Sequence, residues 1–315
     1  MTDAVVEVTG LRKTYRGGFE ALRGVDFDIR RGETFALLGP NGAGKSTTIE
    51  ILEGYRDRSG GTVRVLGVDP HRGGPAWKAR LGIVLQSTGE APSATVRQLL
   101  AHFAGFYPRP RDVDRVIEAV GLTEKAATSV RRLSGGQRRR VDVALGIIGS
   151  PELLFLDEPT TGFDPEVRRQ FWDLIRSLQE EGTTIILTTH YLDEAAELSS
   201  RAAIVVAGRV AALGEIATIG GPAARVPIVR WQEDGILHEE RTDRPGELVA
   251  HLVARGAEPA GLEVVRPTLE DIYLDLLGAA QAGSSEPDAG IPAAASAADI
   301  AVPISVVPAS EGNRA

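Results

Sequence analysis

The eight residues 39–46 combine glycines, a lysine and a hydroxyl group in the pattern G-x-x-x-x-G-K-S. Glycines let the backbone curl so that successive N–H groups point at a phosphate, and the helix that begins near Lys45 adds the positive end of its dipole. In such a loop the lysine reaches the β- and γ-phosphates, and the hydroxyl group of Ser46 binds Mg²⁺. This phosphate loop predicts a nucleoside triphosphate site, but by itself it does not separate ATPases, GTPases and kinases.

Two acids and a histidine follow apolar strands further along the chain. Residues 153–156 are apolar and lead directly into Asp157 and Glu158. Open parallel sheets bind ligands at the carboxyl ends of their strands, so both carboxylates are expected beside the phosphate loop. Asp157 suits the Mg²⁺ shell, and Glu158 suits a general base that orients and polarises an attacking water. His190 follows the apolar residues 184–187 and is expected at the same edge, where it can sense the γ-phosphate.

A second glycine turn, Leu-Ser-Gly-Gly-Gln at residues 133–137, opens another expected helix. Ser134 can cap this helix, while Gly135 and Gly136 expose their backbone N–H groups. The turn therefore predicts a second helix terminus that can bind phosphate. We call residues 133–137 the signature turn.

The pattern of apolar residues predicts the elements that position these groups. Residues 5–8 and 25–29 alternate as half-buried strands do, and residues 34–38 form a short apolar strand before the phosphate loop. Residues 95–121 have a helical pattern with breaks around Pro108 and Pro110, and a further helix is expected at about 166–181. Strands that alternate with helices predict a mainly parallel sheet covered on both faces, and so an α/β fold.

The composition of the sequence changes from about Ile219, where glycine, proline and polar residues become frequent. Near the end, one helix is expected after Thr268, which can cap it together with Asp271. After Gly278 the chain is rich in Ala, Pro, Ser and Gly, and we expect residues 279–315 to be a disordered tail. The apolar face of the expected helix comprises Leu269, Ile272, Tyr273, Leu276 and Leu277.

The composition of the chain excludes several classes of protein. A net charge of −8 over 315 residues argues against a dedicated nucleic-acid binder, and the lack of cysteine excludes disulfides and thiolate metal sites. No run approaches the roughly 18 consecutive apolar residues of a transmembrane helix, and the N-terminus has no signal pattern, so we expect no membrane span in this chain. We interpret the basic cluster Arg138, Arg139 and Arg140 as a solvated helix face.

The phosphate loop, the signature turn, the Asp-Glu pair and the histidine, in this order, closely resemble the ABC ATPase family over residues 4–220. The resemblance implies an α/β P-loop NTPase of ABC type. Its expected parts are an antiparallel β subdomain, a helical subdomain at about 90–145 that carries the signature turn, and a small C-terminal α+β extension at 221–278.

The resemblance also assigns roles to single residues. Tyr15 resembles the aromatic residue that stacks on adenine, and Gln86 resembles the glutamine that contacts Mg²⁺ and couples to a membrane partner. Asp164 belongs to a loop that links two nucleotide sites, in which Phe163 stands where leucine is commoner. The catalytic residues implied are Glu158, His190 and Lys45, and the metal ligands are Ser46, Gln86 and Asp157. The nucleotide-binding residues implied are Tyr15, Gly39, Pro40, Asn41, Gly42, Ala43, Gly44, Lys45, Ser46, Thr47, Ser134, Gly135, Gly136 and Gln137.

In this family the signature turn contacts the nucleotide held by a second subunit. The resemblance therefore implies a head-to-tail dimer of two copies, with two ATP molecules and Mg²⁺ between them. Both sites are expected to be active, because Lys45, Glu158 and His190 are all present. It also implies a separate membrane permease, which we expect to contact Gln86 and residues 87–106 at the cytoplasmic face of a bacterial cell membrane.

Three functions remain open: an exporter ATPase, an importer ATPase, and an ABC protein outside transport. Repair proteins of this family carry long coiled-coil insertions and translation-associated ones usually carry two ATPase domains, and neither feature is present. Importer ATPases more often end in barrel-like domains, for which residues 221–280 are too short. Residues 266–273, Arg-Pro-Thr-Leu-Glu-Asp-Ile-Tyr, resemble the ending of bacterial drug-exporter ATPases, as does the cluster 138–140. We therefore favour export of a drug, antibiotic or lipid-like substrate, with a link to antibiotic resistance.

Overall fold

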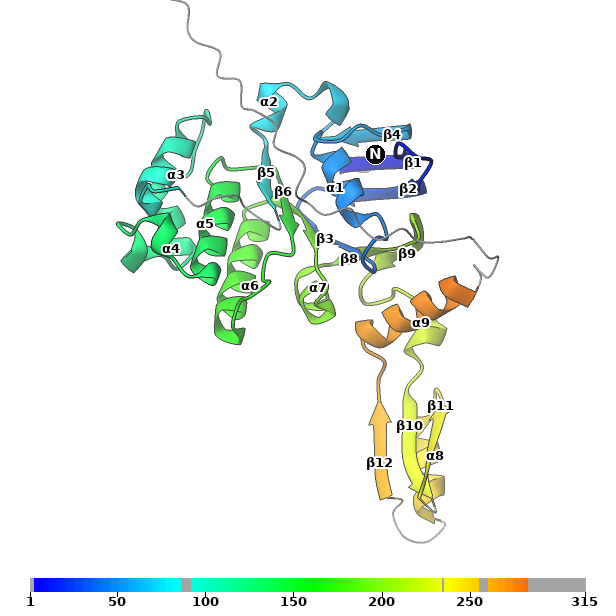
Figure 1. Cartoon of the computed structure of the whole chain (residues 1–315). Helices are drawn as coiled ribbons and strands as arrows, with labels where there is room; N and C mark the ends of the chain where they lie inside the picture. The colour runs from blue at the N-terminus through cyan, green and yellow to red at the C-terminus, as the bar shows by residue number, and fades with distance from the viewer. Residues whose placement is uncertain (1–2, 86–91, 234, 255–259, 283–315) are drawn as a thin grey trace, which may run out of the picture.

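The centre of the molecule is a six-stranded sheet in the order β5-β6-β7-β3-β8-β9 (Figure 1). The computed structural model describes residues 3–85, 92–233, 235–254 and 260–282. Strand pairs from β5 to β8 are parallel, and β9 pairs antiparallel with β8. Every residue of β3 and β7 is buried, which explains why both read as unbroken apolar runs. The strands are β3 (Thr34–Leu38), β5 (Leu81–Val84), β6 (Leu153–Asp157), β7 (Thr184–Thr188), β8 (Arg201–Val206) and β9 (Arg209–Glu215).

Two hydrophobic cores cover opposite faces of this sheet. Alternate residues of β6 point into different cores: Leu154 and Leu156 belong to one, and Leu153 and Phe155 belong to the other. The core around Leu154 is closed by helices, and the core around Phe155 is closed by an antiparallel sheet. Helices α6 (Pro165–Glu180) and α7 (Leu192–Leu198) contribute to the core around Leu154, whereas α1 (Lys45–Leu52) and α2 (Pro75–Lys78) contribute to the core around Phe155, with a 3-10 turn at Pro70–Arg72.

The antiparallel sheet has the order β2-β1-β4 and packs beside the phosphate loop. Its expected strands are present but longer than the alternation at 5–8 and 25–29 predicts, because β1 continues through irregular pairing near Gly10. Phe27 in this sheet stacks on Phe35 of β3, with ring centroids 5.6 Å apart. The strands are β1 (Ala4–Thr14), β2 (Glu20–Arg30) and β4 (Gly60–Val65).

A group of helices lies to the left of the central sheet in Figure 1. Thr95 caps the first helix through a reciprocal pair of hydrogen bonds with Gln98. Pro108 and Pro110 lie between the first two helices, as the sequence predicts. The elements are α3 (Val96–Ala104), α4 (Val113–Ala119) and α5 (Gly135–Ile147), with 3-10 turns at Thr123–Lys125 and Val130–Arg132.

After β9 the chain forms a small domain and then returns to the main body as a helix (Figure 1). The small sheet has the order β11-β10-β12, and α8 covers one face, where Leu252 packs with Val229 and Trp231. None of the helices within the described ranges combines the length and apolar character needed to cross a bilayer. The elements are a 3-10 turn at Pro222–Arg225, β10 (Ile228–Glu233), β11 (Ile236–Arg241), α8 (Pro245–Ala254), β12 (Ala260–Val265) and α9 (Leu269–Ala282).

Helix α9 returns the chain from the small domain to the main body. Thr268 caps it: its N–H donates to Asp271 Oδ2 at 2.7 Å, and its hydroxyl group accepts from the Asp271 N–H at 3.3 Å, which confirms the predicted cap. Ile272 is fully buried against the main body, where a methyl group on Gly220 would lie only 2.5 Å from its Cγ2. The helix differs from the prediction at its end, because it continues past Gly278 to Ala282. Gly278 costs only about 1 kcal/mol relative to alanine, and the alanines that follow it are the best helix formers. Of the expected disordered tail, residues 283–315 lie outside the described residues.

Candidate active site

The phosphate loop joins β3 to α1, and its glycines are required by close packing. Gly39 and Gly44 both have positive φ, at 153° and 105°. A Cβ on Gly39 would lie 2.2 Å from the Val205 carbonyl oxygen, and one on Gly44 would lie 2.6 Å from Leu22 Cδ2. The backbone of the loop can therefore curl against its neighbours only because these two positions lack side chains.

Lys45 begins α1 and folds back over its own loop. Its Nζ donates hydrogen bonds to the carbonyl oxygens of Gly39 at 2.7 Å and Pro40 at 3.1 Å. Burial lowers the pKa of the Lys45 ammonium group, and the carboxylates of Glu158 and Asp157 oppose that shift. An ammonium group has three donors, so the bonds to the loop leave one donor for a phosphate oxygen.

The sheet order brings the two acids to this loop. Strands β6, β7 and β3 are neighbours, so the residues at their carboxyl ends share one edge. Asp157, the last residue of β6, accepts a hydrogen bond from the hydroxyl group of Thr188, the last residue of β7. This contact fixes one carboxylate oxygen of Asp157 and leaves the residue half-buried at the edge.

Glu158 follows with an unusual backbone conformation. Its φ is +47°, in the left-handed region that side chains other than glycine rarely adopt. Its N–H donates to the Thr188 carbonyl oxygen at 3.0 Å, and its carboxylate Oε2 lies 3.5 Å from Nδ1 of His190. The predicted base and the predicted histidine therefore meet at the ends of two adjacent strands.

Tyr15 lies on the other side of the phosphate loop. Its hydroxyl group is hydrogen-bonded to Thr47 Oγ1 at 3.0 Å, and its ring is stacked with Phe19 at a centroid distance of 6.4 Å. The Arg56 guanidinium group lies 5.1 Å from the ring centroid. An aromatic ring held in this way beside a phosphate loop can stack on a base.

One cavity of about 500 Å³ connects Tyr15, the phosphate loop, Asp157 and Glu158, while His190 is not among its described lining residues. Its oxygen donors include Ser46 and Asp157, which are the hard ligands that Mg²⁺ prefers, so the residues fit that ion. Gln86, the third predicted ligand, lies outside the described residues. The cavity is lined by Tyr15, Phe19, Ala21, Asn41, Gly42, Gly44, Lys45, Ser46, Thr47, Asp157 and Glu158.

The signature turn contributes no residue to the described lining of this cavity. Ser134 caps α5: its Oγ accepts from the Gln137 N–H at 3.3 Å, and its own N–H donates to Gln137 Oε1 at 3.1 Å. In Figure 1, α5 and α1 lie on opposite sides of β6. The cap uses the N–H groups of Ser134 and Gln137, and Gly135 between them is exposed at the surface.

The predicted linking loop lies beside the signature turn. Asp164 caps α6 by accepting the Val167 N–H at 2.9 Å. Phe163 is buried edge-on against Phe171, with ring centroids 5.9 Å apart. A Cβ on Gly136 would lie 3.8 Å from Phe163, so the two loops are neighbours.

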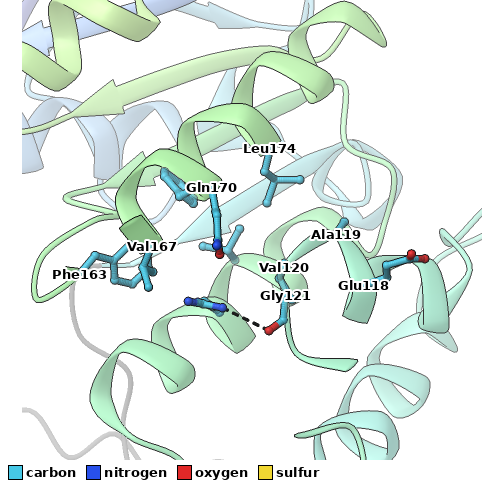
Figure 2. Close-up of a pocket in the computed structure, with 11 residues that line it drawn as sticks. Glu118, Ala119, Val120, Gly121, Phe163, Val167, Gln170 and Leu174 are labelled. Atoms are coloured by element: carbon cyan, nitrogen blue, oxygen red, sulfur yellow. Dashed lines mark hydrogen bonds between the residues drawn. The ribbon is translucent and has the colours of Figure 1, made fainter. Parts of the chain in front are cut away.

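Phe163 also lines a separate cavity of about 290 Å³ between α5 and α6 (Figure 2). Figure 2 shows Phe163, Val167 and Leu174 across this cavity from Val120 and Gly121. Space beside the ring explains how a phenylalanine is accommodated where the family more often has leucine.

Within the basic cluster 138–140, Arg138 is exposed and Arg140 is partly exposed, as the sequence predicts, but the prediction is wrong for Arg139, which is only 7% exposed. Its guanidinium group reaches the loop after β6 and donates to the carbonyl oxygens of Asp157 at 2.5 Å and Pro159 at 3.1 Å. The sequence does hold a signal for this position. Arg139, Val143 and Ile147 recur every four residues, and both apolar members are buried.

Comparisons with known proteins agree with this geometry. The family described as ABC transporter matches residues 22–161. The daunorubicin resistance ATP-binding protein DrrA3 of Streptomyces coeruleorubidus is 36% identical over 310 residues, covering 88% of this chain and 97% of that protein. The Nod factor export ATP-binding protein I of Paraburkholderia xenovorans (strain LB400) is 35% identical, covering 88% and 98%.

A solved structure has the same fold. It is the ATP-binding cassette MJ0796, described as the dimeric structure of a post-hydrolysis state bound to ADP and Pi. The TM-score is 0.61 at 23% identity, and the likeness covers 67% of this chain and 98% of that chain.

Proposed function

This chain belongs to the ABC transporter family, and we propose that it is the ATP-hydrolysing subunit of a bacterial exporter. One observation carries the enzymatic part. The phosphate loop, Asp157 and Glu158 line one cavity, and His190 lies 3.5 Å from Glu158. These are the groups that phosphoryl transfer to water needs: a cradle for the phosphates, a cation and a base for the water.

The phosphate loop, Tyr15, Asp157, Glu158 and the neighbouring His190 have distinct tasks in hydrolysis. The phosphate-loop N–H groups and Lys45 bind and orient the phosphates, and Tyr15 stacks on adenine. Glu158 accepts a hydrogen bond from the attacking water and aligns it with the γ-phosphate, while His190 contacts the same phosphate from the end of β7. When bound, Mg²⁺ would be held by Ser46 and Asp157 and would neutralise charge on the phosphates.

The active form is a head-to-tail dimer of two copies. The exposed signature turn supports this, because it lies apart from the described lining of the cavity in its own chain. A capped helix terminus with an exposed glycine, as at Gly135, is suited to a γ-phosphate, and the second copy supplies one. The solved cassette with the same fold is described as dimeric.

The partner is a separate membrane permease at the cytoplasmic face of the cell membrane. A surface that includes Leu85, the residue directly before the expected docking residues 86–106, supports this. Beside the ATP cavity lies a second cavity of about 670 Å³, whose lining includes Tyr55 and Leu85. These side chains are 75% and 51% exposed, and exposed apolar groups around a cavity favour a protein contact.

Export is supported by the relatives. One is described by daunorubicin resistance and another by Nod factor export, and each match covers nearly the whole relative. The substrate class proposed is therefore a drug, an antibiotic or a lipid-like molecule.

Transport into inside-out vesicles tests this function. Vesicles are prepared from cells that express the chain with the membrane protein that co-purifies with it, and daunorubicin is the fluorescent probe. ATP-dependent accumulation in these vesicles, absent with Lys45→Ala, is expected for an exporter. Accumulation only in right-side-out vesicles would reassign the chain to import, and lack of ATP hydrolysis would reject the enzymatic part.

A further inference from the structure

Arg139 is a buried arginine that connects the helix of the signature turn to the hydrolysis site of the same chain. Its Nη2 donates to the carbonyl oxygens of Asp157 at 2.5 Å and Glu158 at 3.1 Å. Its Nε donates to the carbonyl oxygen of Pro159 at 3.1 Å, and its Nη1 donates to that of Leu85. One side chain of α5 therefore binds three consecutive carbonyl groups that begin at the last residue of β6, and one directly after β5.

These contacts explain why a charged group is buried here. Placing an unpaired charge in a protein interior is costly unless hydrogen bonds compensate it. Backbone carbonyl groups that point into the interior need donors for the same reason. The fork of an arginine carries five donors at fixed angles, which lets one residue satisfy carbonyls from both strand ends.

The carbonyl of Glu158 is of particular importance, because the Glu158 backbone is strained. A left-handed conformation costs roughly 1–2 kcal/mol for a side chain other than glycine, and it persists only where the surroundings hold it. Here the N–H of Glu158 is held by Thr188 of β7, and its carbonyl group is held by Arg139 of α5. The direction of the Glu158 side chain follows from this backbone conformation.

We propose that Arg139 is a positioning residue for ATP hydrolysis, which aims the Glu158 carboxylate by holding its backbone from the helix that carries the signature turn. Ser134, at the start of that helix, is five residues before Arg139. A shift of α5 when Ser134 engages the partner's ATP would therefore move the donor that holds Glu158. In this way each subunit's readiness to hydrolyse its own ATP depends on its contact with the ATP of the other. The proposal rests on the proposed function.

Arg139→Lys is the principal test, because lysine keeps the charge and most of the volume but cannot donate at all the fork positions. Steady-state ATP hydrolysis of the full-length dimer is measured for wild type, Arg139→Lys and Arg139→Gln. We expect kcat to fall on the order of 10²-fold in Arg139→Gln and less in Arg139→Lys, since a catalytic group misplaced by about 1 Å costs that much. We expect KM for ATP to stay within about threefold, because binding does not use Glu158.

A double-variant comparison separates positioning from general structural support. If Arg139 acts through Glu158, adding Arg139→Lys to Glu158→Gln should not lower the residual hydrolysis further. Arg111→Gln is the matched control, because Arg111 is also partly buried and pairs with Glu181 at 2.7 Å, away from the ATP cavity. This control should lower the melting temperature without changing kcat.

The outcomes distinguish the two proposals. If the wild-type chain hydrolyses ATP and Arg139→Lys has the same kcat, the role of Arg139 is overturned and the proposed function stands. Multiplicative losses in the double variant overturn it as well. If Arg139→Gln does not fold, the lysine variant and its double variant decide. No hydrolysis by the wild-type dimer would instead reject the proposed function.

Discussion

The Nδ1 atom of His190 lies 3.5 Å from Oε2 of Glu158, and the two residues come from the ends of the neighbouring strands β7 and β6. The Glu158 side chain is 18% exposed and that of His190 is 50% exposed. The Glu158 carboxylate is therefore sheltered, while the His190 ring is half exposed. This arrangement allows the carboxylate to hold a water on one side and the histidine to contact a phosphate on the other.

Glu158→Gln should leave ATP binding intact and nearly stop hydrolysis, because the amide keeps the shape of the side chain but cannot act as a base. The closed dimer should then accumulate with ATP, which size-exclusion chromatography would detect as a nucleotide-dependent shift to twice the mass. Glu152→Gln is the control at the start of the same strand, where Glu152 pairs with Arg80 at 2.6 Å. It should keep wild-type kcat. Near wild-type turnover in Glu158→Gln would remove Glu158 from its role.

Two inactive variants should restore activity to each other when mixed. Lys45→Ala disables the phosphate loop of its own chain, and Ser134→Arg blocks the signature turn that serves the other chain. In a mixed dimer one site then carries both defects and the other carries neither. ATP hydrolysis should appear on mixing and should be absent from each variant alone. A signature turn that served its own chain would give no recovery at any mixing ratio.

Tyr15→Ala should raise KM for ATP by about tenfold with little change in kcat. Stacking of a base on an aromatic ring contributes roughly 1–3 kcal/mol, and about 1.4 kcal/mol corresponds to a factor of ten. Tyr15→Phe is the control, since it loses only the hydrogen bond to Thr47 and should keep KM within about threefold. An unchanged KM in Tyr15→Ala would show that adenine binds elsewhere.

Glu53→Gln should stabilise the metal-free and nucleotide-free protein at alkaline pH. Burial, together with the charges of Asp157 and Glu50, raises the pKa of Glu53 to about 8. The folded state therefore keeps a proton on Glu53 that the unfolded state has lost. The contribution of Glu53 to the free energy of unfolding is therefore complete below the ordinary pKa of a glutamate. This contribution is lost as the pH rises through about 8.

The variant removes this loss, so its advantage over wild type should grow between pH 5 and pH 9, to on the order of 4 kcal/mol. Urea unfolding at several pH values measures it. Glu152→Gln, which loses the ion pair with Arg80 and is not among the charges that raise the pKa of Glu53, should show no such gain. A difference between Glu53→Gln and wild type that is constant with pH would contradict the assignment.

The sequence predicts that the phosphate loop, Asp157 and Glu158 lie together, as they do in one cavity, because these parts follow strands that are buried on both faces. Such strands are unbroken apolar runs, and each ends at a chemically distinct residue, as β6 does at Asp157. The hairpin of β8 and β9 was not predicted. Ala202 and Ala203 have weak strand propensity, and the turn uses Ala207 and Gly208, both with positive φ, rather than the commoner Asn-Gly.

The role of Arg139 could not be predicted from residue type, because a run of three arginines is typical of a solvated surface. Its burial depends on carbonyl groups of residues that are adjacent only in the folded chain. The contact of Gln86 with a membrane permease stays a prediction, since that residue lies outside the described part of the chain.

The contact between Gly220 and Ile272 has a consequence for how this architecture can diversify. The chain leaves for the small C-terminal domain and comes back at almost the same place. A domain whose two chain ends lie close together can be exchanged, enlarged or excised without a change in the main body. Close chain ends are also what makes domain insertion tolerated in other proteins. Helix α9 would have to remain, because it covers apolar surface around Ile219. The small domain is thus inserted between β9 and α9, and α9 anchors it to the main body.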